Sequence, residues 1–238
     1  SKIYLNPSLE TEEIMDIHRA EEALVFEAGK KRAGQPARTI DGAEIDFAMD
    51  ITDPVDFKRS LKHGFKDIGL LRSEILYQER RDSPKEKDLS KLFTDIAVAV
   101  EGNVTIRMFD MQPDKKPKYF PASELKGAAY LLSEDGQKVA RPLARAILRA
   151  YYAKGNVKIL FPMVEDEAEA EAVRKFIIEV NNEVRKEKKM APSEFSDIQV
   201  GGMIESRNAV GNVENIVKHV DFLDVGTNDL MNNIRGGG

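Results

Sequence analysis

Arginine, carboxylate and amide side chains close four short apolar segments of this 238-residue chain. The segments are Gly69–Glu74 (GLLRSE), Thr105–Asp110 (TIRMFD), Gly202–Ser206 (GMIES) and Gly226–Leu230 (GTNDL). Each begins as an apolar run of strand length and ends in groups that bind anions or metals. Two arginines with a glutamate and an aspartate suit a small phosphorylated anion that is held together with a divalent metal.

The elements that must position these groups form a repeating pattern of strand and helix. The predicted strands are Ile45–Asp50, Ile68–Leu71, Val104–Met108, Val157–Met163, Ile198–Ile204 and Phe222–Gly226. The predicted helices are Ser8–Gly34, Pro54–His63, Pro84–Val100, Arg141–Ala153, Glu165–Lys189 and Asn208–Val220. Strand followed by helix, repeated, indicates a parallel α/β sheet with right-handed crossovers, whose ligands bind at the carboxyl ends of the strands.

Arg72 and Arg107 each close one of two consecutive predicted strands. A guanidinium group is planar, permanently charged and bidentate, so two of them can hold a phosphate and a carboxylate at once. The alternative is a pair of rim salt bridges, with Glu74 beside Arg72 and Asp110 beside Arg107.

Glu205 and Asp229 close two later segments. Two carboxylates, completed by ligand and water oxygens, can form the octahedral shell of Mg²⁺. The alternative is that these segments supply helix N-caps. Ser206 and Asn208 could then accept hydrogen bonds from the unpaired N–H groups of the following helix, and Asn228 or Asp229 from those of the next helix.

Bulk composition excludes several functions. The 36 basic and 41 acidic residues leave a net charge of −5 with no basic tract, so we expect no nucleic-acid partner. The sequence has no apolar run long enough for a bilayer and no secretory signal, so we expect a cytoplasmic protein without a membrane partner. The absence of cysteine excludes disulfides, thiol catalysis and thiolate metal sites.

In this order, the four segments resemble the phosphoenolpyruvate-binding barrel of enzyme I, the phosphoenolpyruvate–protein phosphotransferase of bacterial sugar-uptake systems. Further matches are Asn6-Pro7-Ser8, Thr39–Gly42, Asp114-Lys115 and Phe161–Met163 (FPM), and the resemblance runs from about Ile3 to Leu230. It implies a TIM (β/α)8-type barrel, incomplete here at about six strands. The corresponding domains are an N-terminal linker helix at residues 1–38 and a partial barrel at 39–238.

The resemblance also implies a site and partners. Arg72, Arg107, Asn228 and Arg235 would bind phosphoenolpyruvate, and Glu205 and Asp229 would bind Mg²⁺. The phosphoryl group would pass to a histidine of a phosphohistidine domain that this chain lacks, and from there to a phosphocarrier protein. None of His18, His63 and His219 lies in the family's acceptor loop, so we expect none of them to be phosphorylated.

The chain departs from the family at several positions. Ala128–Leu132 stands where the family has a tryptophan and two arginines, so both are lost near Ala129 and Leu132. Arg207 replaces a proline, Arg235 arrives about four residues early, and the cysteine that protonates the enolate is missing. We therefore assign no catalytic residue and expect this chain alone to be an incomplete, inactive transferase.

Two other functions stay open. One is a degenerate barrel that serves as a partner-binding or dimerisation module, which the lost arginines favour. The other is a fragment of a pyruvate–phosphate dikinase or phosphoenolpyruvate synthase. With six strands, the edges at Ile45–Asp50 and Phe222–Gly226 would stay unpaired, so we expect a homodimer or another association. The long connection Met111–Ala140 is predicted to be a lid or specificity loop.

Overall fold

The computed structural model describes residues 8–32, 37–52, 57, 65–78, 80–110, 117, 119–120 and 123–235. The described residues divide between two compact units, one up to Asp46 and the other from Phe47 onward. The predicted helix Pro54–His63 and the predicted Asp114-Lys115 match lie outside the described residues, apart from Phe57 in the helix. No helix in the described ranges is both long enough and apolar enough to cross a bilayer.

The first unit contains one helix and one small hairpin. Helix α1 spans Leu9–Arg32, and Ser8 Oγ caps it by accepting a hydrogen bond from the Thr11 N–H at 3.3 Å. Strands β1 (Ala37–Arg38) and β2 (Glu44–Ile45) pair antiparallel, and Gly42 turns the chain between them at φ +89°. The sequence predicted the helix and its cap but not the hairpin, because the strands have only two residues each.

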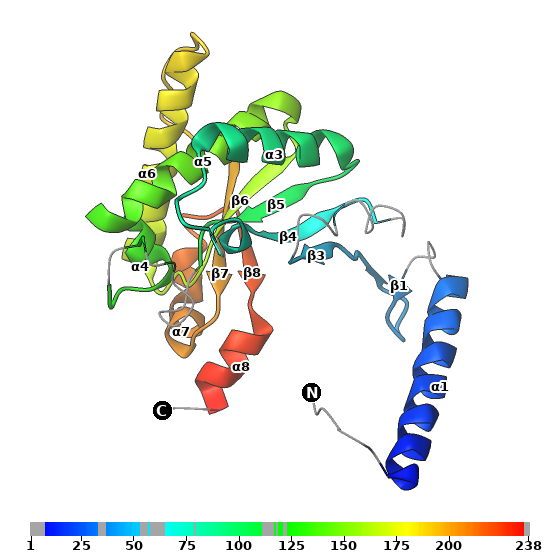
Figure 1. Cartoon of the computed structure of the whole chain (residues 1–238). Helices are drawn as coiled ribbons and strands as arrows, with labels where there is room; N and C mark the ends of the chain where they lie inside the picture. Colours follow the sequence, from blue (N-terminus) through cyan, green and yellow to red (C-terminus); the bar gives the residue numbers. More distant parts are fainter. Residues whose placement is uncertain are drawn as a thin grey trace. The chain divides into compact units, whose positions relative to one another are not determined.

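The second unit is built on a curled parallel sheet of six strands (Figure 1). The strands are β3 (Met49–Ile51), β4 (Ile68–Arg72), β5 (Val104–Arg107), β6 (Val157–Phe161), β7 (Gln199–Ile204) and β8 (Phe222–Val225). They pair in chain order, so β3 and β8 are the two edges of the sheet. This sequential parallel order confirms the predicted incomplete barrel. Five predicted strands are present, whereas the predicted strand Ile45–Asp50 is divided: Ile45 belongs to the β1–β2 hairpin and β3 begins at Met49.

Helices follow the strands around the outer face of this sheet. Their bounds are η1 (Ser73–Leu76), α3 (Glu86–Ala99), α4 (Gly127–Leu132), α5 (Glu134–Lys154), α6 (Glu167–Glu187), α7 (Arg207–Ile216) and α8 (Thr227–Arg235). α3 packs on α5, α5 on α6, α6 on α7 and α7 on α8, as in the outer ring of a barrel. Helix α5 begins seven residues before the predicted Arg141 because Ser133 caps it, accepting from the Gly136 N–H at 3.1 Å. Helix α8 was not predicted.

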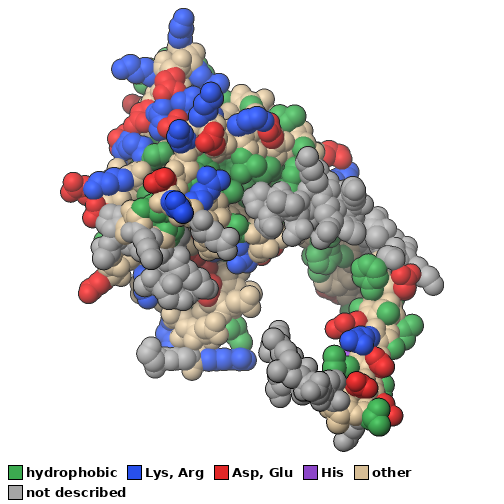
Figure 2. Space-filling model, viewed as in Figure 1, with side chains coloured by type: hydrophobic (Ala, Val, Ile, Leu, Met, Phe, Trp, Pro, Cys, Tyr) green, Lys and Arg blue, Asp and Glu red, His purple; other side chains and the backbone are tan. Residues whose placement is uncertain are grey.

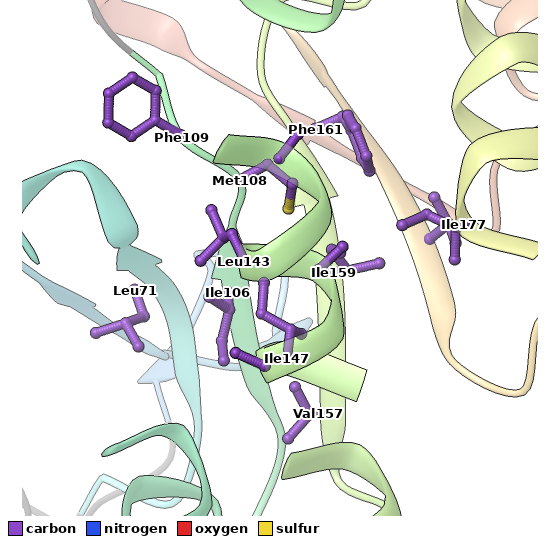
Figure 3. Packing of buried hydrophobic residues seen from close by; sticks show 14 of the residues in the cluster. Leu71, Ile106, Met108, Phe109, Leu143, Ile147, Val157, Ile159, Phe161 and Ile177 are labelled. Atoms are coloured by element: carbon purple, nitrogen blue, oxygen red, sulfur yellow. The ribbon is translucent and has the colours of Figure 1, made fainter. Parts of the chain in front are cut away.

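The two faces of the sheet carry different side chains. On β5, Val104 and Ile106 belong to the apolar core, whereas Thr105 and Arg107 line a cavity on the other face. Figure 3 shows Leu143 and Ile147 of α5 beside Ile106, and both are completely buried. Each such side chain contributes about 1.5–3 kcal/mol by leaving water. Packing in the core therefore fixes which residues of each strand face the helices, and the alternate residues face the cavity.

Part of the connection Met111–Ala140 is packed in the core. The Phe120 ring is buried and stacks on Phe109 at 4.7 Å, and Tyr119 Oη donates a hydrogen bond to the Tyr77 carbonyl at 2.9 Å. Residues 111–116, 118 and 121–122 lie outside the described ranges, so the predicted lid stays a prediction. Phe120 therefore anchors this connection to the core by stacking on Phe109, which follows β5.

Candidate functional site

A bulge in β4 directs Arg72 into the cavity. β3 and β4 pair Met49 with Ile68 but Asp50 with Leu70, so Gly69 is an extra residue in the ladder. The bulge lets Ile68 and Leu71 both join the core while Arg72 faces the other side. Gly69 suits this position because a Cβ there would lie 2.9 Å from the Ala48 Cβ.

Arg72 is held at the cavity by Asp50 of the edge strand. Arg72 Nε donates to Asp50 Oδ1 at 3.2 Å, and Nη2 donates to Oδ2 at 2.7 Å. The two side chains are 37% and 47% exposed. The pair is bidentate and open to solvent, so a ligand can reach the guanidinium group.

Arg107 has a buried environment with several acidic neighbours. Its side chain is 6% exposed and its Nη2 donates a hydrogen bond to Glu74 Oε1. Its Nη1 lies 3.3 Å from Asp110 Oδ2 and 3.8 Å from Glu205 Oε1. Three carboxylates around one guanidinium leave surplus negative charge in a poorly hydrated place, which a bound cation would relieve.

Glu205 is positioned by the loop after β6. Its Oε2 accepts a hydrogen bond from the Met163 N–H at 3.0 Å, and Met163 reaches this geometry at φ +45°. Gly127, the first residue of α4, packs against Met163, and the Ala128 N–H donates to the Pro162 carbonyl at 3.0 Å. α4 therefore supports the loop that orients Glu205.

Asn228 and Asp229 lie in the first turn of α8, directly after β8. Both line the cavity, together with Gly226 and Thr227 of the connecting loop. Ser206, by contrast, caps α7 by accepting from the Ala209 N–H at 3.0 Å, which confirms the capping alternative for that residue. The sequence between β8 and α8 therefore presents polar groups to the same space as β4, β5 and β7.

The cavity that these groups share has a volume of about 910 Å³. It lies at the carboxyl ends of the strands, where ligands bind in parallel sheets. Its ionisable lining among the described residues consists of Asp50, Arg72, Glu74, Arg107, Asp110, Glu205, Asp224 and Asp229. This is enough room for a small phosphorylated anion, a metal ion and several waters.

The carboxyl groups in this cavity disturb one another. Burial raises the pKa of Glu205 to about 7, and the neighbouring Asp110 and Asp229 raise it too, while Arg107 lowers it. Burial is also the main cause that raises the pKa of Asp110, with Asp229 adding to it. A carboxyl that is costly to ionise in its apo environment is a candidate ligand for a cation.

The donor set fits a divalent cation held partly by ligand oxygens. No group of three or more His, Cys, Asp or Glu side chains in the described ranges is arranged to hold a metal by itself. Glu205 and Asp229 both line the cavity and interact electrostatically, so a cation there would have two protein carboxylates. Mg²⁺ commonly takes one or two carboxylates and completes its octahedron with phosphate oxygens and water.

The structure brings five of the predicted site residues together: Arg72, Arg107, Glu205, Asn228 and Asp229 all line the one cavity. Arg235 ends α8 and is not among the described lining residues. Arg207 begins α7, and its N–H donates to Asn233 Oδ1 at 3.2 Å. His18 and His219 lie near Glu21 and Glu167, whereas His63 lies outside the described residues.

Sequence proximity predicted the Asp110 partner of Arg107 correctly but misassigned the partner of Arg72. Glu74 follows Arg72 in the chain but pairs with Arg107, and Arg72 pairs with Asp50. Asp50 and Asp224 also line the cavity and were not predicted. Asp50 could have been found, because it ends a predicted strand in a carboxylate just as the four segments do.

Comparison with known proteins agrees with this geometry. The family model described as "PEP-utilising enzyme, PEP-binding domain" matches residues 27–235. The phosphoenolpyruvate-protein phosphotransferase of Haemophilus influenzae is 30% identical over 239 residues, covering 97% of this chain and 40% of that protein. The protein of the same name from Bacillus subtilis is 31% identical over 236 residues, covering 96% and 40%.

A multiphosphoryl transfer protein of Rhodobacter capsulatus is 33% identical over 204 residues, covering 82% of this chain and 23% of that protein. The chain thus spans 40% or less of the length of these curated relatives. The match over residues 27–235 includes every strand of the sheet and every described group that lines the cavity. The chain belongs to the family of phosphoenolpyruvate-binding domains of phosphoenolpyruvate-utilising enzymes.

Proposed function

We propose that this chain carries the phosphoenolpyruvate site of a phosphoenolpyruvate–protein phosphotransferase and binds its substrate together with Mg²⁺. The observation that carries the proposal is the convergence of Arg72, Arg107, Glu205, Asn228 and Asp229 on one cavity at the carboxyl ends of the strands. The names of the relatives, which cover this chain almost completely, support the same reaction class.

The two arginines would bind the ligand in different ways. Arg72 is exposed enough to grip the phosphate or the carboxylate from the cavity mouth, where its fork matches two oxygens. Arg107 is fixed by Glu74 and would present its positive charge from the cavity floor. Asn228 would donate its amide N–H to a phosphoryl oxygen. Transfer of this kind depends mainly on positioning and charge stabilisation, which these groups supply.

Glu205 and Asp229 would hold the metal ion. When bound, Mg²⁺ would neutralise charge on the phosphoryl oxygens. Glu205 enters this role already oriented by the Met163 N–H, and burial together with its acidic neighbours raises its pKa to about 7. Binding of the cation would therefore be coupled to loss of a proton from Glu205.

In the reaction, the bond between phosphorus and the enol oxygen of phosphoenolpyruvate breaks and a bond forms to a histidine nitrogen on a separate phosphohistidine domain. A phosphocarrier protein would then receive the group. The enolate of pyruvate leaves and takes up a proton. The chain contains no cysteine, so a thiol of this chain cannot supply that proton.

Calorimetric titration of the chain with phosphoenolpyruvate tests the proposal. With Mg²⁺ present we expect binding, and with a chelator we expect affinity to fall by at least tenfold. Arg72→Ala should weaken binding at least tenfold, since a hydrogen bond to a charged ligand contributes about 1.5–3 kcal/mol. Arg235→Ala tests whether the residue that ends α8 also contacts the ligand.

Arg174→Ala is the matched control. Arg174 forms a comparable partly exposed ion pair with Asp221 at 2.9 Å and is absent from the described lining of the cavity. Unchanged affinity in Arg72→Ala, or equal affinity with and without the chelator, would contradict the assigned arginine or the assigned metal. Failure of every variant and the parent chain to bind would favour a non-catalytic partner-binding module.

A further inference from the structure

Asp50 occupies the face of Arg72 that an anionic ligand would use. Its two oxygens accept from Nε at 3.2 Å and from Nη2 at 2.7 Å, which is the side-on, two-pronged geometry that a phosphate or carboxylate also adopts on arginine. A ligand that grips Arg72 in this way must first displace Asp50 or share the guanidinium group with it.

Carboxylates outnumber arginines in the cavity, so the loss of one free arginine to Asp50 matters for the binding of an anion. Its described lining holds six carboxylates (Asp50, Glu74, Asp110, Glu205, Asp224 and Asp229) against two arginines, a formal charge of −4 when all are ionised. Arg107 already faces Glu74 and Asp110 on the buried side. Arg72 is therefore the more accessible positive charge for an incoming anion, and Asp50 neutralises it.

Asp50 can be removed from this balance at a lower structural cost than Glu74 or Glu205. Glu74 compensates a buried arginine, and Glu205 accepts the Met163 N–H, so both have structural roles. The Asp50 side chain is 47% exposed on the edge strand β3, and it accepts two hydrogen bonds from Arg72. Exposed ion pairs of this kind contribute little to the stability of the fold, so Asp50 can influence the affinity of Arg72 for a ligand without a large effect on folding.

We infer that Asp50 is an affinity-setting residue: it competes with the anionic ligand for Arg72 and holds phosphoenolpyruvate binding below what the two arginines would otherwise give. This inference rests on the proposed function for the identity of the ligand, whereas the competition itself applies to any phosphate-bearing anion. Replacing Asp50 by Asn keeps the size of the side chain and removes both the charge and half of the acceptor fork.

The experiment is calorimetric titration with two probes, phosphoenolpyruvate and inorganic phosphate, each at saturating Mg²⁺. In Asp50→Asn we expect about tenfold tighter binding of both probes than in the parent chain. The matched control is Asp224→Asn, which removes the same charge from the same cavity and leaves the Arg72–Asp50 pair in place. It should gain less than threefold. Arg72→Ala in the Asp50→Asn background should abolish the gain.

The outcomes separate this inference from the proposed function. Equal phosphoenolpyruvate affinity in the parent and Asp50→Asn chains would overturn the role of Asp50 and leave the proposed function intact. Tighter binding of inorganic phosphate by Asp50→Asn, with no phosphoenolpyruvate bound by any variant, would support Asp50 and contradict the proposed function. Equal gains in affinity in Asp50→Asn and Asp224→Asn, or a gain that survives loss of Arg72, would overturn the role of Asp50. No binding of either probe would reject both.

Discussion

Arg72 and Arg107 are register partners on the adjacent strands β4 and β5, yet one is 37% exposed and the other 6%. The same residue type at the same level of the sheet thus has two roles. Arg72 pairs with one exposed carboxylate, whereas Arg107 is embedded among Glu74, Asp110 and Glu205. The difference arises because β4 lies beside the edge of the sheet and β5 lies inside it.

We predict that alanine destabilises the fold much more at Arg107 than at Arg72. Arg107→Ala leaves Glu74 buried without its partner, which should lower the free energy of unfolding by about 3–5 kcal/mol. Arg72→Ala breaks an exposed pair and should cost about 1 kcal/mol or less. Urea unfolding followed by circular dichroism measures both. The double variant Arg107→Met, Glu74→Leu should recover much of the loss, and a double variant as unstable as Arg107→Ala would contradict this account.

The titration of Glu205 should give the stability of the chain a distinct pH dependence. Its pKa rises from an ordinary 4.5 to about 7 on folding, so the folded state binds the extra proton between these values. The free energy of unfolding should therefore fall as pH rises through this window, because the protonated form favours the folded state. Glu205→Gln should remove this component and be more stable than the parent at pH 8 by up to about 3 kcal/mol.

Denaturant unfolding at pH 5 and pH 8 tests the Glu205 prediction. At pH 5 the two chains should have nearly equal stability, since both carry an uncharged group at position 205. Saturating Mg²⁺ at pH 8 should stabilise the parent chain more than Glu205→Gln, if the cation binds there. Parallel pH profiles for the two chains would show that the Glu205 carboxyl does not couple to folding.

A methyl group at Gly226 should disturb the proposed metal site from the loop after β8. A Cβ there would lie 2.6 Å from Glu205 Cγ and 2.7 Å from its Oε1, so the carboxylate would have to move. Gly226→Ala should weaken Mg²⁺-dependent phosphoenolpyruvate binding at least tenfold in calorimetry. Gly202→Ala is the control, because its methyl would meet Val164 at an ordinary 3.5 Å. Equal binding by both variants would place the metal elsewhere.

The outer helices are joined by an ionic network centred on Arg145 of α5. Arg145 bonds to Glu86 of α3 at 3.0 Å, to Glu183 of α6 at 2.8 Å, and to Glu187. Figure 2 shows charged side chains of both signs intermixed over α5 and α6. Because Arg145 is only 16% exposed, Arg145→Met should cost about 1–2 kcal/mol in 0.1 M salt.

The Arg145 prediction is checked by unfolding at 0.1 M and 1 M salt. The loss should shrink at 1 M, where screening acts over about 3 Å. Lys91→Met, which breaks an exposed pair with Asp95 on α3, should cost less than about 0.5 kcal/mol at either concentration. A larger loss of stability for Lys91→Met than for Arg145→Met would contradict the role of the Arg145 network in joining the helices.

The architecture, and the gathering of the polar residues at one end of the sheet, could be predicted from the sequence. Apolar runs of strand length alternating with helical stretches predict a parallel sheet in chain order, and the pairing of β3 to β8 follows that order. Because all parallel strands end at one rim, polar residues after strands must gather there. That Arg72, Arg107, Glu205, Asn228 and Asp229 line one cavity could therefore be expected from local pattern and the family resemblance; their roles in binding stay a prediction.

The partners of Arg72 and Glu74 follow from the three-dimensional packing and could not be predicted from the sequence. The β4 bulge at Gly69 changes the phase of the strand, so simple alternation does not give the direction of Arg72. Two of the ion pairs then cross between strands: Glu74 meets Arg107, and Asp50, distant in sequence, meets Arg72. Burial likewise depends on neighbours that pack from remote segments, which is why the pKa of Glu205 rises while the sequence shows only a strand end.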